Sequence, residues 1–332
     1  MTFDLPLAIG GLIVGIVVGL TGMGGGALMT PMLVFVFGVN PLTAISSDIV
    51  VSLLMKPVGA AVHFRRGTVN IELVKWLALG SVPMAFAGAW LISQMPGEQV
   101  DEILKRVLGI ALLTSTFGLF VRASLQMWRN RLPLGEGPAP MTRPAAVVVR
   151  PGRTLVLGAV AGLMVGLTSV GAGSIVVVTL LLMYPRLKAS SLVGTDLAQA
   201  IPLVAAAAAG HLLFGDFSFT VAAPLLVGAI PGAWIGAHIS SRAPGGVIRR
   251  ILAVLLLATG LKLLGVPDVL VIAAAAAAVG FAFVAWGLIR NRVTKRPPAR
   301  DEANGSGSLA LGGAPLPVAA DDTYAEPEAR GR

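Results

Sequence analysis

Long apolar runs, most of them free of charged residues, constrain the fold of this chain more than any other feature. Lipid offers no partner to backbone N–H and C=O groups, so an apolar run of about 20 residues satisfies them by forming a helix. A transmembrane β-barrel would alternate polar and apolar residues, which these runs do not do. The sequence therefore predicts an all-α, polytopic integral membrane protein. The runs lie at residues 5–21, 27–39, 42–63, 73–95, 103–121, 154–168, 174–184, 189–213, 219–240, 248–264 and 269–289.

The composition agrees with this class and excludes several others. Charged residues make up 12% of the chain, against about 25% in a soluble domain. The net charge of +9 predicts no nucleic-acid partner, because Arg and Lys cluster beside the apolar runs as they do in cytoplasmic loops. The absence of cysteine excludes disulfides and thiol chemistry. No basic region precedes the first run, so we expect an uncleaved first segment.

The chain repeats itself at an offset of 147 residues, which becomes 148 after one inserted residue. Asp48 recurs as Asp196, and the segment from Gly19 to Thr21 recurs as Gly166 to Thr168. So many matches in one register predict two homologous halves. Further matching pairs are Gly11 and Gly158, Gly15 and Gly162, Gly24 and Gly171, Gly26 and Gly173, His63 and His211, Gly67 and Gly215, Gly80 and Gly228, Pro83 and Pro231, Gly88 and Gly236, and Pro96 and Pro244. We interpret the spaced glycines of runs 5–21 and 154–168 as helix-packing faces.

The distribution of Lys and Arg predicts that the halves have opposite orientations. Arg65 and Arg66 favour a cytoplasmic loop after run 42–63, whereas the equivalent loop around Asp216 has no basic excess. We expect two inverted repeats, each a glycine-broken hairpin followed by three spans. The predicted parts are a first transmembrane repeat (1–121), a cytoplasmic linker rich in Arg and Pro (122–153), a second repeat (154–265), an extra C-terminal transmembrane helix (266–295) and a disordered cytoplasmic tail (296–332).

A glycine-rich break interrupts the first pair of runs in each half, at residues 21–26 and 168–173. Broken helices at corresponding positions of inverted repeats mark the midplane binding sites of many transporters. The helix after each break would point N–H groups and a positive dipole end at a small anion. Close packing by small residues alone is the alternative. The candidate substrate-binding residues are Thr21, Gly22, Gly24, Gly25, Gly26, Thr168, Ser169, Gly171, Gly173, Ser47 and Thr195.

Asp48, Asp196 and Lys56 lie several residues from the ends of the predicted spans, where charge is costly and usually functional. Asp48 and Asp196 occupy equivalent positions, and either carries a coupling proton or caps a helix. Lys56, whose equivalent is Val204, binds an anion, pairs with an acid or extends toward the inner surface. We take all three as coupling candidates. His63 and His211 end equivalent spans, and we interpret them as interfacial polar residues.

Enzyme signatures are missing from the sequence. It contains no H-E-x-x-H, G-x-S-x-G or P-loop pattern, so we expect neither an enzyme nor a metal, nucleotide or other cofactor. Active transport would then use an ion gradient or the gradient of the substrate. An intramembrane enzyme stays an alternative, although it would need a nucleophile and base, or metal ligands, in one cavity.

At the two breaks and the two buried acids the chain resembles the TauE/SafE family of sulfite exporter-like membrane proteins. The resemblance covers about residues 5–265 and rests on the segments 19–26, 44–48, 166–173, 193–196, 210–215 and 231–237 with Pro31. It implies a multi-pass transporter of the bacterial inner membrane that moves sulfur oxyanions or organosulfonates, such as sulfite or sulfoacetate. Ser169 and Ala172 depart from the glycines of the first half, and the last span and tail look like additions.

These observations together predict a secondary transporter that exports a small anion through a site at the bilayer midplane. A channel-like anion uniporter of the same fold would share every sequence feature. The expected partners are the anionic solute and the lipid bilayer, with a homo-oligomer left open. We expect the C-terminus in the cytoplasm.

Overall fold

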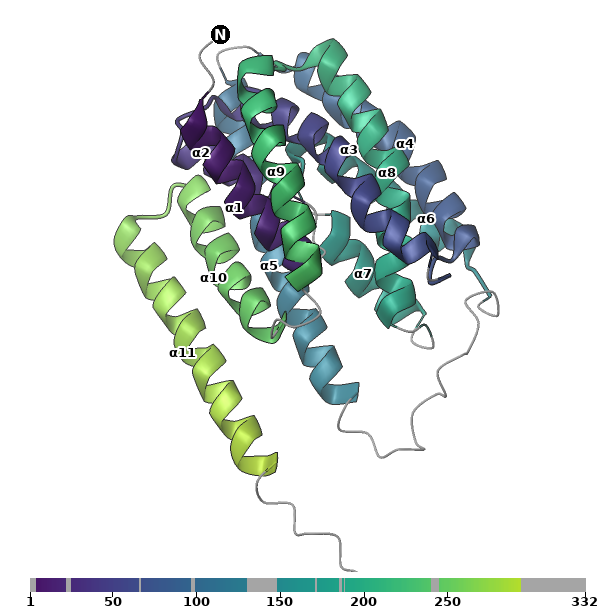
Figure 1. Cartoon of the computed structure of the whole chain (residues 1–332), viewed down its shortest axis with the longest axis vertical. Coiled ribbons are helices and arrows are strands. Elements are labelled where there is room, and N and C mark those ends of the chain that lie inside the picture. The colour runs from purple at the N-terminus through teal and green to yellow at the C-terminus, as the bar shows by residue number, and fades with distance from the viewer. Residues whose placement is uncertain are drawn as a thin grey trace, which may run out of the picture. The chain divides into compact units, whose positions relative to one another are not determined.

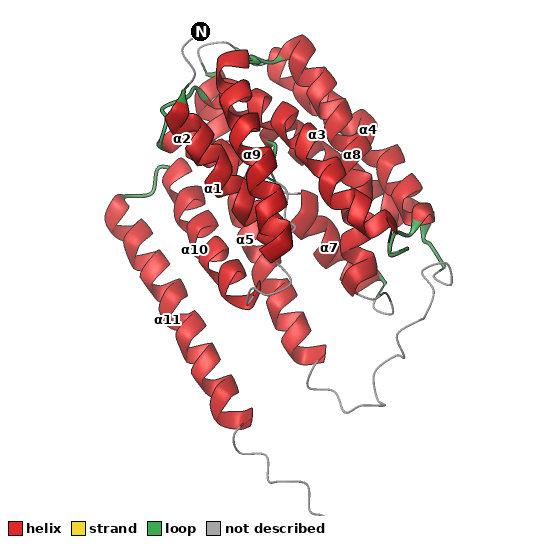
Figure 2. Ribbon diagram, in the orientation of Figure 1, coloured by secondary structure: helices red, strands yellow, loops and turns green. Residues whose placement is uncertain are grey.

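The computed structural model describes residues 4–21, 25–65, 67–96, 99–129, 148–170, 172–184, 187, 189–239 and 245–293. All regular structure in these residues is helical, as Figure 2 shows. A helix forms at each predicted apolar run, with ends that differ by a few residues. The helices are α1 (Leu5–Thr21), α2 (Gly26–Phe35), α3 (Pro41–Arg65), α4 (Ile71–Ser93), α5 (Val100–Arg129), α6 (Pro151–Thr168), α7 (Ala172–Met183), α8 (Ala189–Phe214), α9 (Phe219–Ile239), α10 (Gly245–Leu263) and α11 (Asp268–Val293) (Figure 1).

Helix ends reach into the segment that the sequence predicts as a linker. α5 continues to Arg129, and α6 begins at Pro151 in the first helical position, where a missing N–H costs nothing. Residues 130–147 and the predicted tail lie outside the described residues. The chain divides into two compact units, Met1–Ala285 and Trp286–Arg332. The second unit begins within α11.

Five of the described helices are long and apolar enough to cross a membrane. Shorter helices of the bundle also expose large apolar side chains that water would disfavour; on α1, for example, Leu5, Ile9 and Ile13 share one exposed face. Lipid is the solvent that suits such surfaces. The five candidate spans are Ile71–Ser93, Val100–Val121, Pro151–Thr168, Ser191–Phe214 and Phe219–Gly236.

Glycine faces bring two pairs of helices into close contact, α1 with α9 and α4 with α6. A Cβ atom at Gly15 would overlap the carbonyl oxygen of Ala229, and one at Gly162 would overlap that of Ser81. Small residues let helix backbones approach this closely in membranes. The predicted packing role of these glycines is confirmed. The same overlap would occur at Gly11, Gly158, Gly166, Gly80, Gly228, Gly232 and Gly236.

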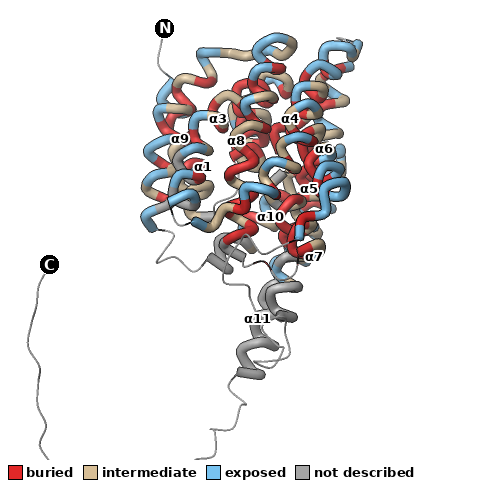
Figure 3. The backbone as a smooth tube through the Cα atoms, turned by 90° about the vertical axis from the view of Figure 1, so that its right-hand side faces the viewer, coloured by how far each residue is buried: buried red, intermediate tan, exposed pale blue. Residues whose placement is uncertain are grey.

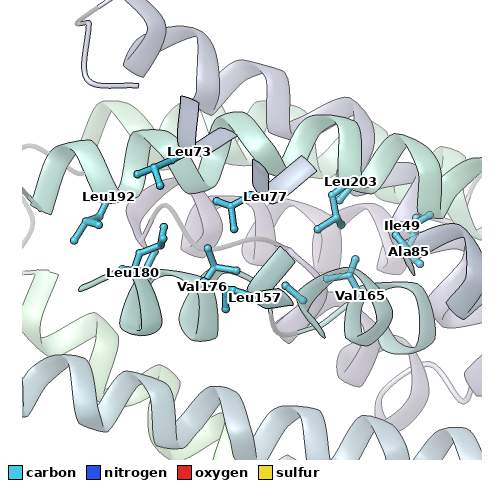
Figure 4. Packing of buried hydrophobic residues seen from close by; sticks show 14 of the residues in the cluster. Ile49, Leu73, Leu77, Ala85, Leu157, Val165, Val176, Leu180, Leu192 and Leu203 are labelled. Carbon is cyan, nitrogen blue, oxygen red and sulfur yellow. The ribbon is translucent and has the colours of Figure 1, made fainter. Parts of the chain in front are cut away.

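The largest buried apolar cluster joins α3, α4, α6, α7 and α8. Figure 4 shows its side chains pointing toward one another between these helices. α8 is buried along most of its length, which Figure 3 displays as red tube. This core therefore surrounds α8 and positions its polar residues inside the bundle. Members labelled in the figure include Ile49, Leu77, Leu157, Val176 and Leu203.

Candidate functional site

The first break lies between α1, which ends at Thr21, and α2, which begins at Gly26. Gly25 is the N-cap of α2 and forms no side-chain cap hydrogen bond. Gly22 and Gly24 lie outside the described residues, as does the side chain of Thr21. The start of α2 therefore carries the positive end of a helix dipole without a capping side chain of its own.

The second break follows α6 and is shaped by Thr168 and Ser169. Ser169 is the described non-glycine residue with a positive φ, at 61°, and its N–H donates to the carbonyl of Val165 at 2.8 Å. This left-handed geometry usually selects glycine at a helix end. The Thr168 hydroxyl donates to the carbonyl of Met164 and accepts from the N–H of Val170. The hydroxyl of Thr168 thus stabilises the backbone of the break through these two hydrogen bonds. Gly171 lies outside the described residues.

The two breaks meet inside the bundle. A Cβ atom at Gly26 would overlap the carbonyl oxygen of Ser169 and would lie 2.6 Å from its Oγ. Val170 also belongs to one buried cluster with Ala27 and Leu28, the residues that follow Gly26. Gly26 and Ser169, 143 positions apart in the sequence, therefore come into direct contact where the helices are interrupted.

Asp48 is fully buried beside this meeting point. Its Oδ2 accepts hydrogen bonds from Thr30 Oγ1 at 2.6 Å and from Ser169 Oγ at 2.8 Å. Its Oδ1 accepts from Ser52 Oγ at 3.3 Å. A Cβ atom at Gly25 would lie 3.9 Å from the same Oδ1. The carboxyl group thus joins α2, α3 and the second break, and it lies against the start of α2.

Asp196 occupies the corresponding place in the second half. A Cβ atom at Gly173, in the first turn of α7, would lie 3.2 Å from Asp196 Oδ2. Gln199 Nε2 approaches Asp196 Oδ1 at 3.5 Å, and Gln199 Oε1 accepts from Ser81 Oγ at 3.3 Å. Each buried acid therefore lies at the N-terminal turn of the short helix in its own half, where a carboxylate is stabilised by the helix dipole.

Lys56 supplies positive charge near both acids. Its ammonium group interacts electrostatically with Asp48, two turns earlier on α3, and with Asp196 on α8. The side chain is partly buried. An opposite charge within electrostatic reach lowers the cost of placing an ionisable group inside an apolar bundle. Charges from both halves are therefore gathered near the breaks.

Ser47 and Thr195, which the sequence places in the site, bind backbone of the opposite half. Ser47 Oγ accepts from the N–H of Ser218 at 3.3 Å, and Thr195 Oγ1 accepts from the N–H of Asn70 at 3.1 Å. These contacts are equivalent, because 47 and 195 are separated by the same 148 residues as 70 and 218. Asn70 is also the N-cap of α4. A role of either hydroxyl in binding substrate stays a prediction.

His211 is fully buried rather than exposed at a helix end. Its Nε2 lies 2.7 Å from the carbonyl oxygen of Gly166, so this nitrogen carries the proton. Its Nδ1 then accepts from Ser46 Oγ at 2.9 Å, and Ser46 Oγ accepts from the N–H of Asp216 at 3.2 Å. His211 therefore ties α8 to α3 and to the last turn before the second break. The side chain of His63 lies outside the described residues.

Several donors in this site were not among the residues proposed from the sequence. Thr30 bears the single hydroxyl in the sequence of α2, and Ser52 lies one helical turn after Asp48. Both residues could have been proposed from the sequence as hydrogen-bond donors to a buried Asp48. The contact between Ser46 and His211 could not be predicted from local sequence, because the two residues are 165 positions apart.

Buried acids beside two helix interruptions, inside a bundle of apolar helices, define a polytopic membrane protein with an internal polar site. Residues 7–263 match the family described as sulfite exporter TauE/SafE. The chain therefore belongs to the TauE/SafE family, and it is a membrane transporter of that family.

Curated relatives point the same way. The chain is 39% identical over 256 residues to the "Probable membrane transporter protein YjnA" of Bacillus subtilis (strain 168), covering 76% of this chain and 97% of that protein. It is 24% identical over 255 residues to the "Probable membrane transporter protein YdhB" of the same organism, covering 76% and 96% of the two chains. No solved structure matches.

Proposed function

We propose that this protein is a secondary transporter that moves a small oxyanion through a site between the two breaks. The observation that carries the proposal is the direct contact of Gly26 with Ser169. It brings the start of α2 beside the second break, which immediately precedes α7, and helix N-termini bind anions through their N–H groups and dipoles. Sulfite or an organosulfonate such as sulfoacetate is the proposed substrate, on the strength of the family to which the chain belongs.

The buried acids make proton coupling part of this proposal. Asp48 and Asp196 lie against the helix starts that would receive the anion. An ionised carboxylate and a bound anion repel each other strongly at a site of low dielectric constant. Asp48 would therefore be protonated when the anion is bound and ionised when it is absent. Lys56 interacts electrostatically with both Asp48 and Asp196, and the contacts that Asp48 receives from α2 and the second break come from uncharged hydroxyls.

We also propose that the two halves are inverted repeats and that the C-terminus is cytoplasmic. The packing of α1 on α9 and of α4 on α6 supports the repeat, because α1 and α9 of one pair are equivalent in sequence to α6 and α4 of the other. The equivalent contacts of Ser47 and Thr195 support the repeat as well. The distribution of Lys and Arg supports the inversion and the cytoplasmic C-terminus. A reporter fused after residue 293 and another inserted near residue 216 test the topology, and both responding from the same side would contradict it.

Transport by the purified protein in proteoliposomes tests the proposal. Sulfite, sulfoacetate, sulfate and chloride are offered separately, with and without a pH gradient across the vesicle membrane. We expect sulfite or sulfoacetate to accumulate against its own gradient when the pH gradient is imposed. Movement only down the gradient would favour the channel-like uniporter. A protein that moves none of the four anions would refute the proposed function.

A further inference from the structure

Ser115 on α5 is a buried polar residue that the site as described so far does not use. Its side chain is 3% exposed. In the described part of the chain, its Oγ is the buried side-chain polar atom without a hydrogen-bond partner. A buried hydroxyl in this state costs free energy, and native proteins hold few of them, usually where water or a ligand completes the bonding.

Its two neighbours on α5 show the usual arrangement for a hydroxyl in an apolar helix. Thr114 Oγ1 donates to the carbonyl of Ile110 at 2.7 Å, and Thr116 Oγ1 donates to that of Leu112 at 2.9 Å. Such bonds to the carbonyl four residues earlier satisfy the hydroxyl within its own helix. Ser115 makes no such bond, so its hydroxyl is left for a partner outside α5.

The face of α5 that carries Ser115 packs in one buried cluster with residues beside the two breaks and with residues of α10. Residues three, four and seven positions apart share one face of a helix. The residues of α5 at these spacings from Ser115 belong to one buried cluster with residues of the second break and of the start of α2. That cluster includes Leu108, Ala111, Leu112 and Leu119 of α5, Val170, Ala27 and Leu28 beside the breaks, and Leu256 and Leu263 of α10 (Gly245–Leu263).

We propose that the Ser115 hydroxyl donates a hydrogen bond to an oxygen of the transported oxyanion, so that α5 forms a third wall of the site. This inference rests on the proposed function. A neutral hydroxyl donates well to an anionic oxygen. It complements the N-terminal ends of α2 and α7, and it introduces no further charge into the bundle.

The test is the KM for sulfite in proteoliposomes, measured for Ser115→Ala and the wild type. We expect KM to rise by about tenfold, the usual effect of losing one hydrogen bond to a charged group, while the maximal rate changes little. Thr114→Val and Thr116→Val are matched controls on the same helix, because their hydroxyls are already satisfied within α5. We expect KM within about twofold of the wild type for both.

Thermal unfolding in detergent distinguishes a hydroxyl that binds substrate from one that stabilises the substrate-free protein. Because the Ser115 hydroxyl is unpaired without substrate, Ser115→Ala should keep or raise the unfolding temperature of the substrate-free protein. The rise in that temperature on adding sulfite should shrink. A lower substrate-free temperature with an unchanged KM would assign the hydroxyl a structural partner and overturn the inference.

The same measurements distinguish an error in the Ser115 contact from an error in the proposed transport function. If the wild type transports sulfite and Ser115→Ala does so with the same KM, the contact is wrong and the transport function stands. If the wild type is neither stabilised by any of the four anions nor transports one, both are overturned.

Discussion

Ser169 Oγ donates a hydrogen bond of 2.8 Å to Asp48 Oδ2, joining the break of the second half to a buried acid of the first. The two residues are 121 positions apart in the sequence. Ser169 reaches the acid from a left-handed backbone conformation, with φ at 61°, which is costly for a residue with a side chain. The glycine-like backbone geometry and the hydroxyl are therefore both used at this position.

Substitution of Ser169 separates these two contributions. Ser169→Ala loses the hydrogen bond and keeps the strained backbone, whereas Ser169→Gly loses the bond and relieves the strain. We expect the glycine variant to be more stable than the alanine variant by about 1 kcal/mol. Thermal unfolding in detergent measures the difference, and equal unfolding temperatures would contradict the strain. Both variants should transport more slowly than the wild type.

Replacement of the buried acid should abolish the pH dependence of transport. Since the proposed anion enters when Asp48 is protonated, wild-type transport should rise as the pH falls. Asp48→Asn is always neutral, so we expect a rate that no longer responds to pH and no uphill accumulation driven by a pH gradient. Initial rates of sulfoacetate transport in proteoliposomes between pH 5 and pH 8 measure this, because the carboxylate and sulfonate of that substrate stay ionised over the range.

The control for this prediction is Asp268→Asn. Asp268 is exposed and pairs with Lys262 at 3.1 Å, far in the sequence from the buried acids. Its removal should leave the pH profile within about 20% of the wild type, as expected for an exposed ion pair. An Asp48→Asn protein that keeps the wild-type pH profile would exclude Asp48 as the coupling group.

A side chain as small as alanine should not fit at position 26. The added Cβ would overlap the carbonyl oxygen of Ser169, which is backbone and has no flexible end to move aside. We expect Gly26→Ala to lower stability by about 1–3 kcal/mol, the usual cost of overpacking, and to abolish transport. Gly280→Ala is the control, since open space surrounds that glycine. Gel filtration and thermal unfolding measure both, and a fully active Gly26→Ala protein would refute the close contact.

His211 should stabilise the fold through its two hydrogen bonds. His211→Phe keeps most of the buried volume and leaves the carbonyl of Gly166 without its donor, so we expect about 1–3 kcal/mol less stability. His238→Phe is the matched control, because His238 is exposed, its ring lies tilted against that of Trp234, and its Nδ1 lies 3.0 Å from the Trp234 carbonyl oxygen in contact with solvent or lipid. Unfolding temperatures in detergent compare the two. Equal loss in both variants would argue against a special role for the buried imidazole.

The distribution of apolar runs was sufficient to predict the helices, because a helix is the local solution for backbone groups in lipid. The glycine spacing on α1 and α6 likewise predicted a packing face, since residues three and four apart lie on one side of a helix. The end of α5 was harder to place. It continues to Arg129 among polar residues, where hydropathy no longer marks a helix.

The partners of the site residues could not be predicted in this way. Asp48 was recognisable as a costly buried charge, but nothing in the sequence links it to Ser169. Ser47 was proposed as a substrate residue, and its hydroxyl accepts from the N–H of Ser218 instead of standing unbonded. His211 resembled a helix-end residue and is fully buried between three helices.

The sequence by itself determined the class of protein and the residue types that are costly inside a membrane, and it predicted two related halves, because these follow from local composition and spacing. Only the tertiary structure decided that Gly26 contacts Ser169, that each acid lies at the start of a short helix, and that Ser115 has no bond within α5. Such relationships depend on how helices far apart in the sequence pack together. Packing is fixed by the close approach of whole surfaces, and no single run of residues encodes it.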